Sequence, residues 1–144
     1  MRMVIFLFAN IFLSCTAFAN FNGMQTCIKD TCFNTRIADT PVSRSKGLMA
    51  ETFLPKNEGM LFMFPTLGKP QFWMKNTRIP LDILFINDED IIVYMVKHAQ
   101  PCNNTVCPIY KTTREASKVL EINAGLSNEY GFHVGDLVEY FVVD

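Results

Sequence analysis

Apolar residues in this chain fall into short runs that are rich in aromatic and β-branched side chains and are separated by polar or glycine- and proline-containing turns. Runs of this length and composition predict β-strands. The predicted strands cover residues 32–39, 59–64, 70–75, 81–86, 91–98, 118–122 and 137–142.

Several of these runs are continuously apolar, as in Met60–Phe64. A strand with one solvent-exposed face would instead alternate apolar and polar residues. A continuous apolar run predicts a strand that is covered on both faces. The polar stretch Asn87–Asp90 lies between two of the strongest runs and predicts a turn. Residues 81–98 are therefore expected to form a hairpin.

Two short helices are predicted between the strands. Ser43 is expected to cap a helical turn over residues 44–51, and Asn123 to cap residues 124–130, with Gly131 in the left-handed position that ends the second helix. The predicted architecture is mainly β, a compact single-domain antiparallel β-barrel or sandwich with one or two short helices.

The N-terminus has the pattern of a secretory signal. Arg2 precedes an apolar block, Val4–Leu13, and the stretch closes on Ala17-Phe-Ala19, which has the small-x-small form that a signal peptidase reads. Residues 1–19 are interpreted as a cleaved signal peptide, because the block is only about half as long as a membrane span. A retained anchor and lipidation at Cys15 are the alternatives.

The mature chain would then be a single domain over residues 20–144. The chain has 13 Lys and Arg and 14 Asp and Glu residues, so that loss of Arg2 with the signal leaves 12 against 14, a net charge of −2. No basic run is present that would favour nucleic acid or anionic lipid. We expect no nucleic-acid partner and no integral membrane span after cleavage.

Four cysteines remain in the mature chain as two pairs of identical spacing, Cys27 with Cys32 and Cys102 with Cys107. Export favours disulfides. A two-residue turn at Lys29-Asp30 would place Cys27 opposite Cys32 at a close, non-hydrogen-bonded position of a hairpin. A four-thiolate metal site is the competing interpretation, and four cysteines allow three disulfide pairings.

Four stretches of the chain carry a resemblance to a known family. They are Lys46-Gly-Leu-Met49, Glu58-Gly-Met-Leu-Phe-Met-Phe-Pro65, the run from Phe72-Trp-Met-Lys-Asn-Thr-Arg78 to Ile86, and Pro101-Cys102. Together they resemble the family known as domain of unknown function 192. The resemblance implies a small closed β-rich fold and no assigned activity.

The segment Trp73–Asp82 contains the densest group of chemically versatile side chains. Trp73 is a stacking surface for a sugar or aromatic ligand, Lys75 and Arg78 are cations for an anion, and Asn76 can bind a ligand or its own turn. The predicted ligand-binding residues are Trp73, Lys75, Asn76, Thr77, Arg78, Asp82 and Arg44. The structural alternative is a core Trp73, a side-chain-stabilised turn at Asn76-Thr77, and an Asp82 that caps or pairs.

Catalytic signals are sparse. Glu58 and Asp82 are the acidic residues within the stretches that resemble the family, and they are the weak candidates for an acid–base pair. No nucleophile elbow is present, and His98 and His133 lack the spacing of metal ligands. The methionines are interpreted as core residues in preference to copper ligands, so no metal and no cofactor are expected.

We therefore expect a periplasmic or secreted protein of unknown biochemical function, and we favour a binding module over an enzyme. The interpretation is a non-catalytic binding or accessory module of the cell envelope that recognises a small molecule, a glycan or an envelope protein through Trp73–Asp82. The alternatives are a hydrolase or lyase that uses Glu58 and Asp82, and a structural or partner-stabilising protein.

Overall fold

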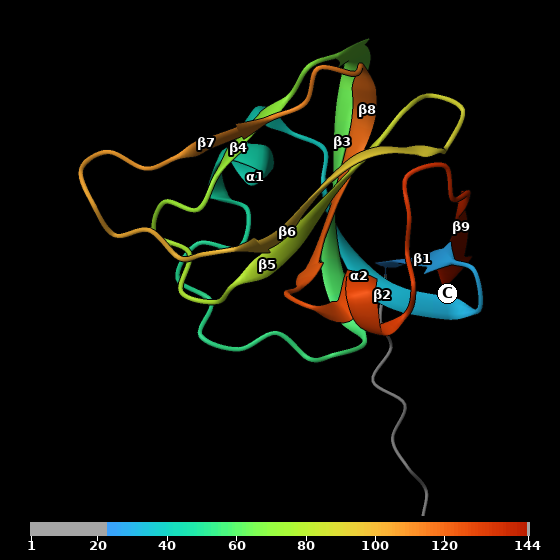
Figure 1. Cartoon of the computed structure of the whole chain (residues 1–144), viewed down its shortest axis with the longest axis horizontal. Coiled ribbons are helices and arrows are strands. Elements are labelled where there is room, and N and C mark those ends of the chain that lie inside the picture. Colours follow the sequence, from blue (N-terminus) through green and yellow to red (C-terminus); the bar gives the residue numbers. More distant parts are fainter. Residues whose placement is uncertain (1–22, 144) are drawn as a thin grey trace, which may run out of the picture.

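The computed structural model describes residues 23–143 as a mainly β domain with two short helices (Figure 1). A seven-stranded sheet has the order β6-β5-β8-β3-β2-β1-β9, and β4 pairs with β7 in a separate two-stranded ribbon. The bounds of the elements are β1 Gly23–Ile28, β2 Thr31–Ala38, α1 Pro41–Lys46, β3 Glu58–Gly68, β4 Gln71–Trp73, β5 Leu81–Ile86, β6 Ile92–Ala99, β7 Ile109–Lys111, β8 Ala116–Asn123, α2 Leu126–Glu129 and β9 Val138–Val143. The expected signal peptide and Cys15 lie outside the described residues.

The large sheet is not closed into a barrel. Its two outer strands, β6 and β9, lie at opposite ends of the strand order, and a single isolated bridge joins Ile91 to Leu137 near them. One strand pair is parallel: β2 runs beside β3 after the chain crosses through α1. The prediction of a mainly β domain is confirmed, whereas the sheet is mixed where an antiparallel one was expected.

The first hairpin has the predicted register. Lys29 and Asp30 form the turn, with Lys29 at φ 53°, and Cys27 lies directly opposite Cys32. The disulfide between them joins Cα atoms that are 4.0 Å apart, and Cys102 is bonded to Cys107 with a Cα separation of 5.8 Å. Both predicted disulfides are present.

The central strands are buried on both faces, as their continuous apolar runs predict. All six residues of β5 are buried, and β5 pairs with β6 on one side and β8 on the other. The predicted hairpin over residues 81–98 is confirmed, and its turn is held by the Asn87 carboxamide oxygen, which accepts from the backbone N–H groups of Glu89 and Ile91.

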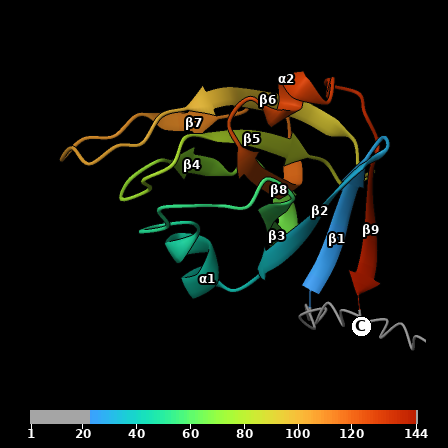
Figure 2. The same ribbon diagram turned by 90° about the horizontal axis from the view of Figure 1, so that it is seen from below.

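Each face of the central strands supports its own apolar cluster. One cluster contains Phe62, Phe72 and Phe85 and includes Leu48 from the segment after α1; the other contains Phe33 and Phe132 and includes Leu126 of α2. In Figure 2, α1 and α2 accordingly lie on opposite sides of the central strands. The α1 face is the one on which a cavity forms.

Both helices begin and end at other residues than predicted. Thr40 caps α1 through a reciprocal capping box with Ser43, because Pro41 follows it at the first helical position and Ser43 is already inside the helix. Gly47 then ends α1 at φ 47°. Asn123 does not cap α2; it ends β8, and its side-chain amide donates to the carbonyl oxygen of Leu54. Gly131 does adopt the expected left-handed conformation, at φ 65°.

Candidate functional site

A cavity of about 390 Å³ lies between α1 and the aromatic cluster on that face of the sheet. Its volume is within the range of small-molecule sites. Segments far apart in the sequence contribute to it: α1 and the turn after it, β3, β4, the turn after β4, and β8. The residues that line it include Arg44, Lys46, Gly47, Phe62, Phe64, Phe72, Trp73, Thr77 and Glu121.

Aromatic rings form the inner wall of the cavity. The ring of Phe72 packs edge-on against Phe62, with centroids 4.9 Å apart, and against Phe85 at 5.8 Å. Residues alternate in direction along β4, so Phe72 is buried whereas its neighbour Trp73 is about half exposed, at 49%. Edge-to-face contacts of this kind hold the rings in fixed positions.

The end of α1 forms the opposite wall. Gly47 has φ 47° and ψ −136°, a conformation that residues with a side chain rarely adopt. A Cβ atom at this position would lie 3.2 Å from Cζ of Phe62. The Arg44 guanidinium lies 5.2 Å from the centroid of Phe64 and donates to the carbonyl oxygen of Met63 at 2.9 Å. The bare backbone at Gly47 therefore lets α1 approach the rings closely.

Glu121 is the buried ionisable group of the cavity. It lies in β8 between Met60 of β3 and Ile83 of β5 in the strand register, and it is 5% exposed. Burial alone raises the pKa of its carboxyl group from 4.5 to about 8, because no neighbouring charge offsets the loss of water. Glu121 is therefore mainly protonated at neutral pH.

Trp73 stands at the rim of the cavity and faces solvent. The Lys75 ammonium lies 5.3 Å from its ring centroid. A second, smaller hollow of about 230 Å³ is lined by Gln71, Phe72, Trp73 and Ile109, so that Trp73 borders both spaces. A half-exposed indole between two hollows is a surface on which a ligand ring can stack.

The structure brings together three of the residues that the sequence predicted for ligand binding: Arg44, Trp73 and Thr77 line the cavity. Lys75 lies beside it on the Trp73 ring. Asn76, Arg78 and Asp82 are not among the lining residues. Asn76 has φ 56°, and its backbone N–H donates to Cys102 and its carbonyl oxygen accepts from Ala50, so it supports the turn.

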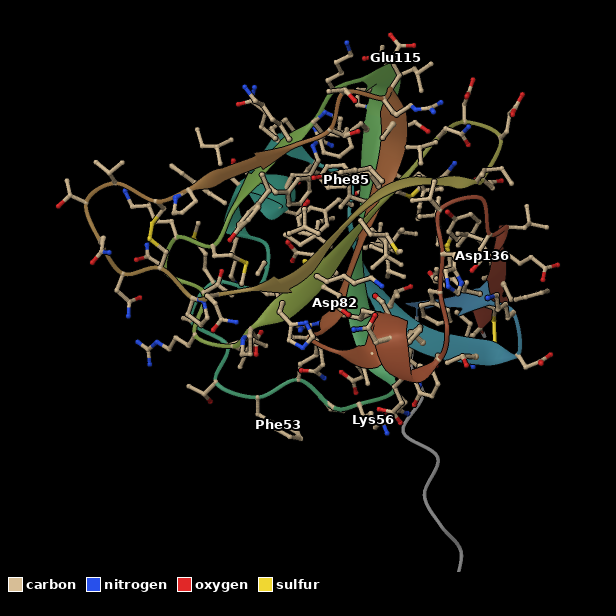
Figure 3. All side chains as sticks on the ribbon, in the orientation of Figure 1. Phe53, Lys56, Asp82, Phe85, Glu115 and Asp136 are labelled. Carbon is tan, nitrogen blue, oxygen red and sulfur yellow. A yellow bond between two sulfur atoms is a disulfide. The ribbon has the colours of Figure 1, made fainter. Side chains whose placement is uncertain are left out.

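Asp82 has a structural role on the other face of the sheet. It is fully buried; Oδ1 accepts from the backbone N–H of His98 at 2.9 Å, and Oδ2 accepts from those of Gly125 at 3.1 Å and Ser127 at 3.0 Å. Figure 3 shows Asp82 close to α2, where it accepts from the N–H groups of the cap residue Gly125 and of Ser127. The Asp82 side chain thus links β5 to β6 and to the start of α2.

Glu58 and Asp82 do not form a pair. Ile122 of β8 is opposite Asp82 of β5 on one side and opposite Gly59 of β3 on the other. Asp82 and Gly59 are therefore two strand spacings apart. Glu58 precedes Gly59, and strand alternation directs its side chain to the face opposite to that of Asp82. The predicted acid–base pair is therefore not assembled.

Sequence reasoning missed Glu121, although a signal was present. The residue interrupts the apolar run Val119-Leu-Glu-Ile122 in the predicted strand 118–122. Carboxyl groups are rarely buried without a partner, so an acidic residue inside such a run indicates a special environment. Glu58 and Asp82 were predicted as the acidic candidates instead, because they lie inside the stretches that resemble the family.

The part of the chain that the structure describes contains no helix of the length and apolarity needed to cross a membrane. Over residues 23–143, no three His, Cys, Asp or Glu side chains are placed to hold a metal ion together.

Comparison with known proteins identifies a family without an assigned activity. Residues 24–140 match the model of domain of unknown function 192, described as "Uncharacterized ACR", and the chain belongs to this family. A search of curated proteins finds no match.

Two crystal structures are similar to this chain. One is a protein of unknown function from Novosphingobium aromaticivorans, with 32% identity, a TM-score of 0.73, and coverage of 81% of this chain and 82% of the other. The second, from Sinorhizobium meliloti, is described as a "putative transcription regulator"; it has 30% identity, a TM-score of 0.73, and coverage of 81% of this chain and 91% of the other.

Proposed function

We propose that this member of domain of unknown function 192 is an exported, non-catalytic binding module that holds a small molecule in the cavity between α1 and β3, β4 and β8. The observation that carries the proposal is the combination of a cavity of about 390 Å³, a fixed wall of aromatic rings and one buried carboxyl group. Binding sites for small molecules typically combine apolar walls with a few polar groups.

The proposed site includes only part of the segment that the sequence predicted for ligand binding. The segment Trp73–Asp82 contributes its first part, since Trp73 and Thr77 line the cavity. Asp82 instead binds backbone N–H groups on the opposite face, and the proposal does not use it. The proposal also leaves out catalysis by Glu58 and Asp82, because the strand register keeps them apart.

Export to the periplasm or the cell exterior is part of the proposal. Two disulfides support an oxidising compartment, since cytosolic thiols are normally kept reduced. The test is the intact mass of the purified protein: we expect the mass of residues 20–144 with two disulfides. A mature N-terminus at Met1, or free thiols, would contradict this part of the proposal.

A thermal-shift screen of the oxidised protein against small organic molecules tests binding. A ligand present at about a hundredfold excess over its Kd stabilises the folded state by about 2.7 kcal/mol, which a melting curve resolves. We expect at least one class of ligand to raise the Tm, and Trp73→Ala to lose the shift.

The matched control is Phe141→Ala on β9. Phe141 is 51% exposed, close to the 49% of Trp73, and does not line the cavity. This variant removes an equally exposed aromatic side chain and should keep the full shift. Equal shifts in the two variants would place the ligand elsewhere and overturn the proposed site.

A protein partner is a second candidate, favoured by exposed apolar side chains next to the cavity. Trp73 is paired with Ile109 across the β4-β7 ribbon, and Ile109 is 57% exposed. Exposed apolar patches are common at sites of protein association. Amine crosslinking through Lys111, which is exposed in the same strand β7, tests this candidate in the cell envelope. The candidate predicts a specific adduct that Ile109→Asp abolishes.

A further inference from the structure

Among residues 23–143, no side chain offsets the burial of the Glu121 carboxyl group. Glu121 is 5% exposed and lines the cavity, and burial is the sole cause that shifts its titration. A buried carboxyl group normally has a hydrogen-bond or charge partner, because its desolvation is costly otherwise. A ligand in the cavity would be such a partner.

The charged side chains around the cavity are cations. Arg44 and Lys46 of α1 line it, and Lys75 lies beside it on Trp73. The neighbours of Glu121 in the adjacent strands are apolar, Met60 in β3 and Ile83 in β5.

One further cation shares this face of the sheet. Arg36 in β2 is opposite Met60, so it points to the same side as Glu121, but its guanidinium is paired with Glu51 at 2.9 Å. None of these charged groups shifts the titration of Glu121, whose cause is burial alone. Glu121 is also the sole acidic residue among those that line the cavity.

We infer that the cavity takes an organic anion with an apolar body, such as an aryl carboxylate, which accepts a hydrogen bond from the carboxyl group of Glu121 and has its charge offset by Arg44 and Lys46. The inference rests on the proposed function and specifies its ligand class. The apolar body would lie against Phe62 and Phe72, which wall the cavity.

An organic cation fits the same cavity less well. Aromatic faces attract cations, but Arg44 already lies over Phe64 and Lys75 over Trp73. A cationic ligand would also be repelled by Arg44 and Lys46, which line the cavity. A ligand carboxylate meets the opposite situation: attraction by these two side chains and, below about pH 8, a neutral Glu121 that can donate its proton in a hydrogen bond.

The inference predicts the pH dependence of binding. A carboxyl group with a pKa of about 8 is about 90% protonated at pH 7 and about 10% protonated at pH 9. The ionised form has no proton to donate and repels an anion. Affinity for an anionic ligand should therefore fall about tenfold from pH 7 to pH 9.

The test compares three probes that share one aromatic ring and differ in charge: phenylacetate, phenylacetamide and 2-phenylethylamine. Trp73 is the sole tryptophan, so its fluorescence reports on the rim of the cavity, and NMR shifts provide a second readout for weak binding. We expect phenylacetate to bind about tenfold more tightly than the amide at pH 7, and the amine to bind most weakly.

Two variants separate the roles of the charged residues. Glu121→Gln keeps a hydrogen-bond donor that does not titrate, so phenylacetate should bind it with nearly equal affinity at pH 7 and pH 9. Lys46→Ala should lower the preference for phenylacetate over the amide, whereas Lys97→Ala, an exposed lysine on β6 that does not line the cavity, should not.

Each contrary outcome has a separate meaning. Equal affinity for phenylacetate and phenylacetamide would overturn the anion inference while supporting a binding cavity. Tightest binding of the amine, with affinity that rises with pH, would replace the anion by a cation and also leave the proposed function intact. If none of the three probes binds, the inference is overturned, and the thermal-shift screen with Trp73→Ala decides the proposed function by itself.

Discussion

Two buried carboxyl groups on neighbouring strands differ in almost every respect except burial. Asp82 in β5 and Glu121 in β8 are offset by one residue in the strand register, since Asp82 is opposite Ile122 and Glu121 is opposite Ile83. Strand alternation therefore directs them to opposite faces of the same sheet. Asp82 accepts three backbone hydrogen bonds, whereas burial is the sole influence on the titration of Glu121.

The difference separates a carboxyl group with a structural role from one that lines a cavity. The N–H groups that Asp82 satisfies belong to the end of β6 and the region around α2, so the carboxylate ties three segments together (Figure 3). Glu121 lines a cavity whose other side is formed by α1. A buried carboxylate that accepts several backbone hydrogen bonds holds the fold, whereas a buried carboxyl group that lines a cavity is a candidate for contact with a ligand.

The largest expected effect is that of Asp82→Ala. The substitution leaves three backbone N–H groups without their acceptor inside the protein, which should lower the free energy of unfolding by about 3–5 kcal/mol. Urea denaturation at pH 7 measures it. Glu58→Ala, which removes a partly exposed carboxylate at the start of β3, is the control and should change stability by less than about 1 kcal/mol. Similar values for both variants would mean that the hydrogen bonds of Asp82 contribute little.

The second prediction concerns the pH dependence of stability caused by Glu121. Below about pH 4.5 the carboxyl group is protonated in the folded and the unfolded chain. Between pH 4.5 and about pH 8 the unfolded chain loses this proton while the folded chain keeps it, so the stability falls as the pH rises.

Glu121→Gln should remove this loss, which is about 2.5 kcal/mol between pH 5 and pH 7. Urea denaturation of the wild type and the variant at both pH values measures the difference. Glu115→Gln, at an exposed position, is the control and should retain the wild-type pH dependence. If Glu121→Gln retains it as well, Glu121 is not the group responsible, and the contrast with Asp82 is lost.

The smallest effect is expected for Gly47→Ala, which changes the wall opposite Glu121. The residue has φ 47°, and its Cβ atom would lie 3.2 Å from the Phe62 ring, so we expect a cost of about 1–3 kcal/mol and weaker ligand binding. The control is Gly68→Ala, where no atom lies within 4 Å and φ is not positive. Thermal unfolding and phenylacetate titration compare the two variants; equal behaviour would show that α1 can move away from the rings.

Most of the fold could be predicted from the sequence because its signals are local. Strand 81–86 was predicted with its observed bounds, and the turns at Lys29-Asp30 and Asn87–Asp90 lie where polar residues interrupt apolar runs. The helix bounds were less accurate, because Thr40 and Ser43 both have the side chain of a capping residue and the proline at position 41 favours the first of them.

The candidate site could be predicted only in part. Trp73, Thr77 and Arg44 line the cavity, whereas Asp82 and Asn76 satisfy backbone groups. Residue type indicates what a side chain can bind. The polar groups of Asp82 and Asn76 could have bound a ligand or backbone groups of a turn equally well. The choice between them depends on which backbone groups lie near, which the sequence does not specify.

The sequence by itself determined the β-rich class, the register of the first hairpin with its disulfide, and the burial of the central strands on both faces. These features depend on contacts between residues close in the chain or on the apolar content of a single strand. Only the tertiary structure decided that β2 pairs in parallel with β3 and that the sheet stays open. It also decided that Glu121 faces a cavity while Asp82 faces α2. Strand alternation directs adjacent residues to opposite faces, but which face receives which helix is set by long-range packing.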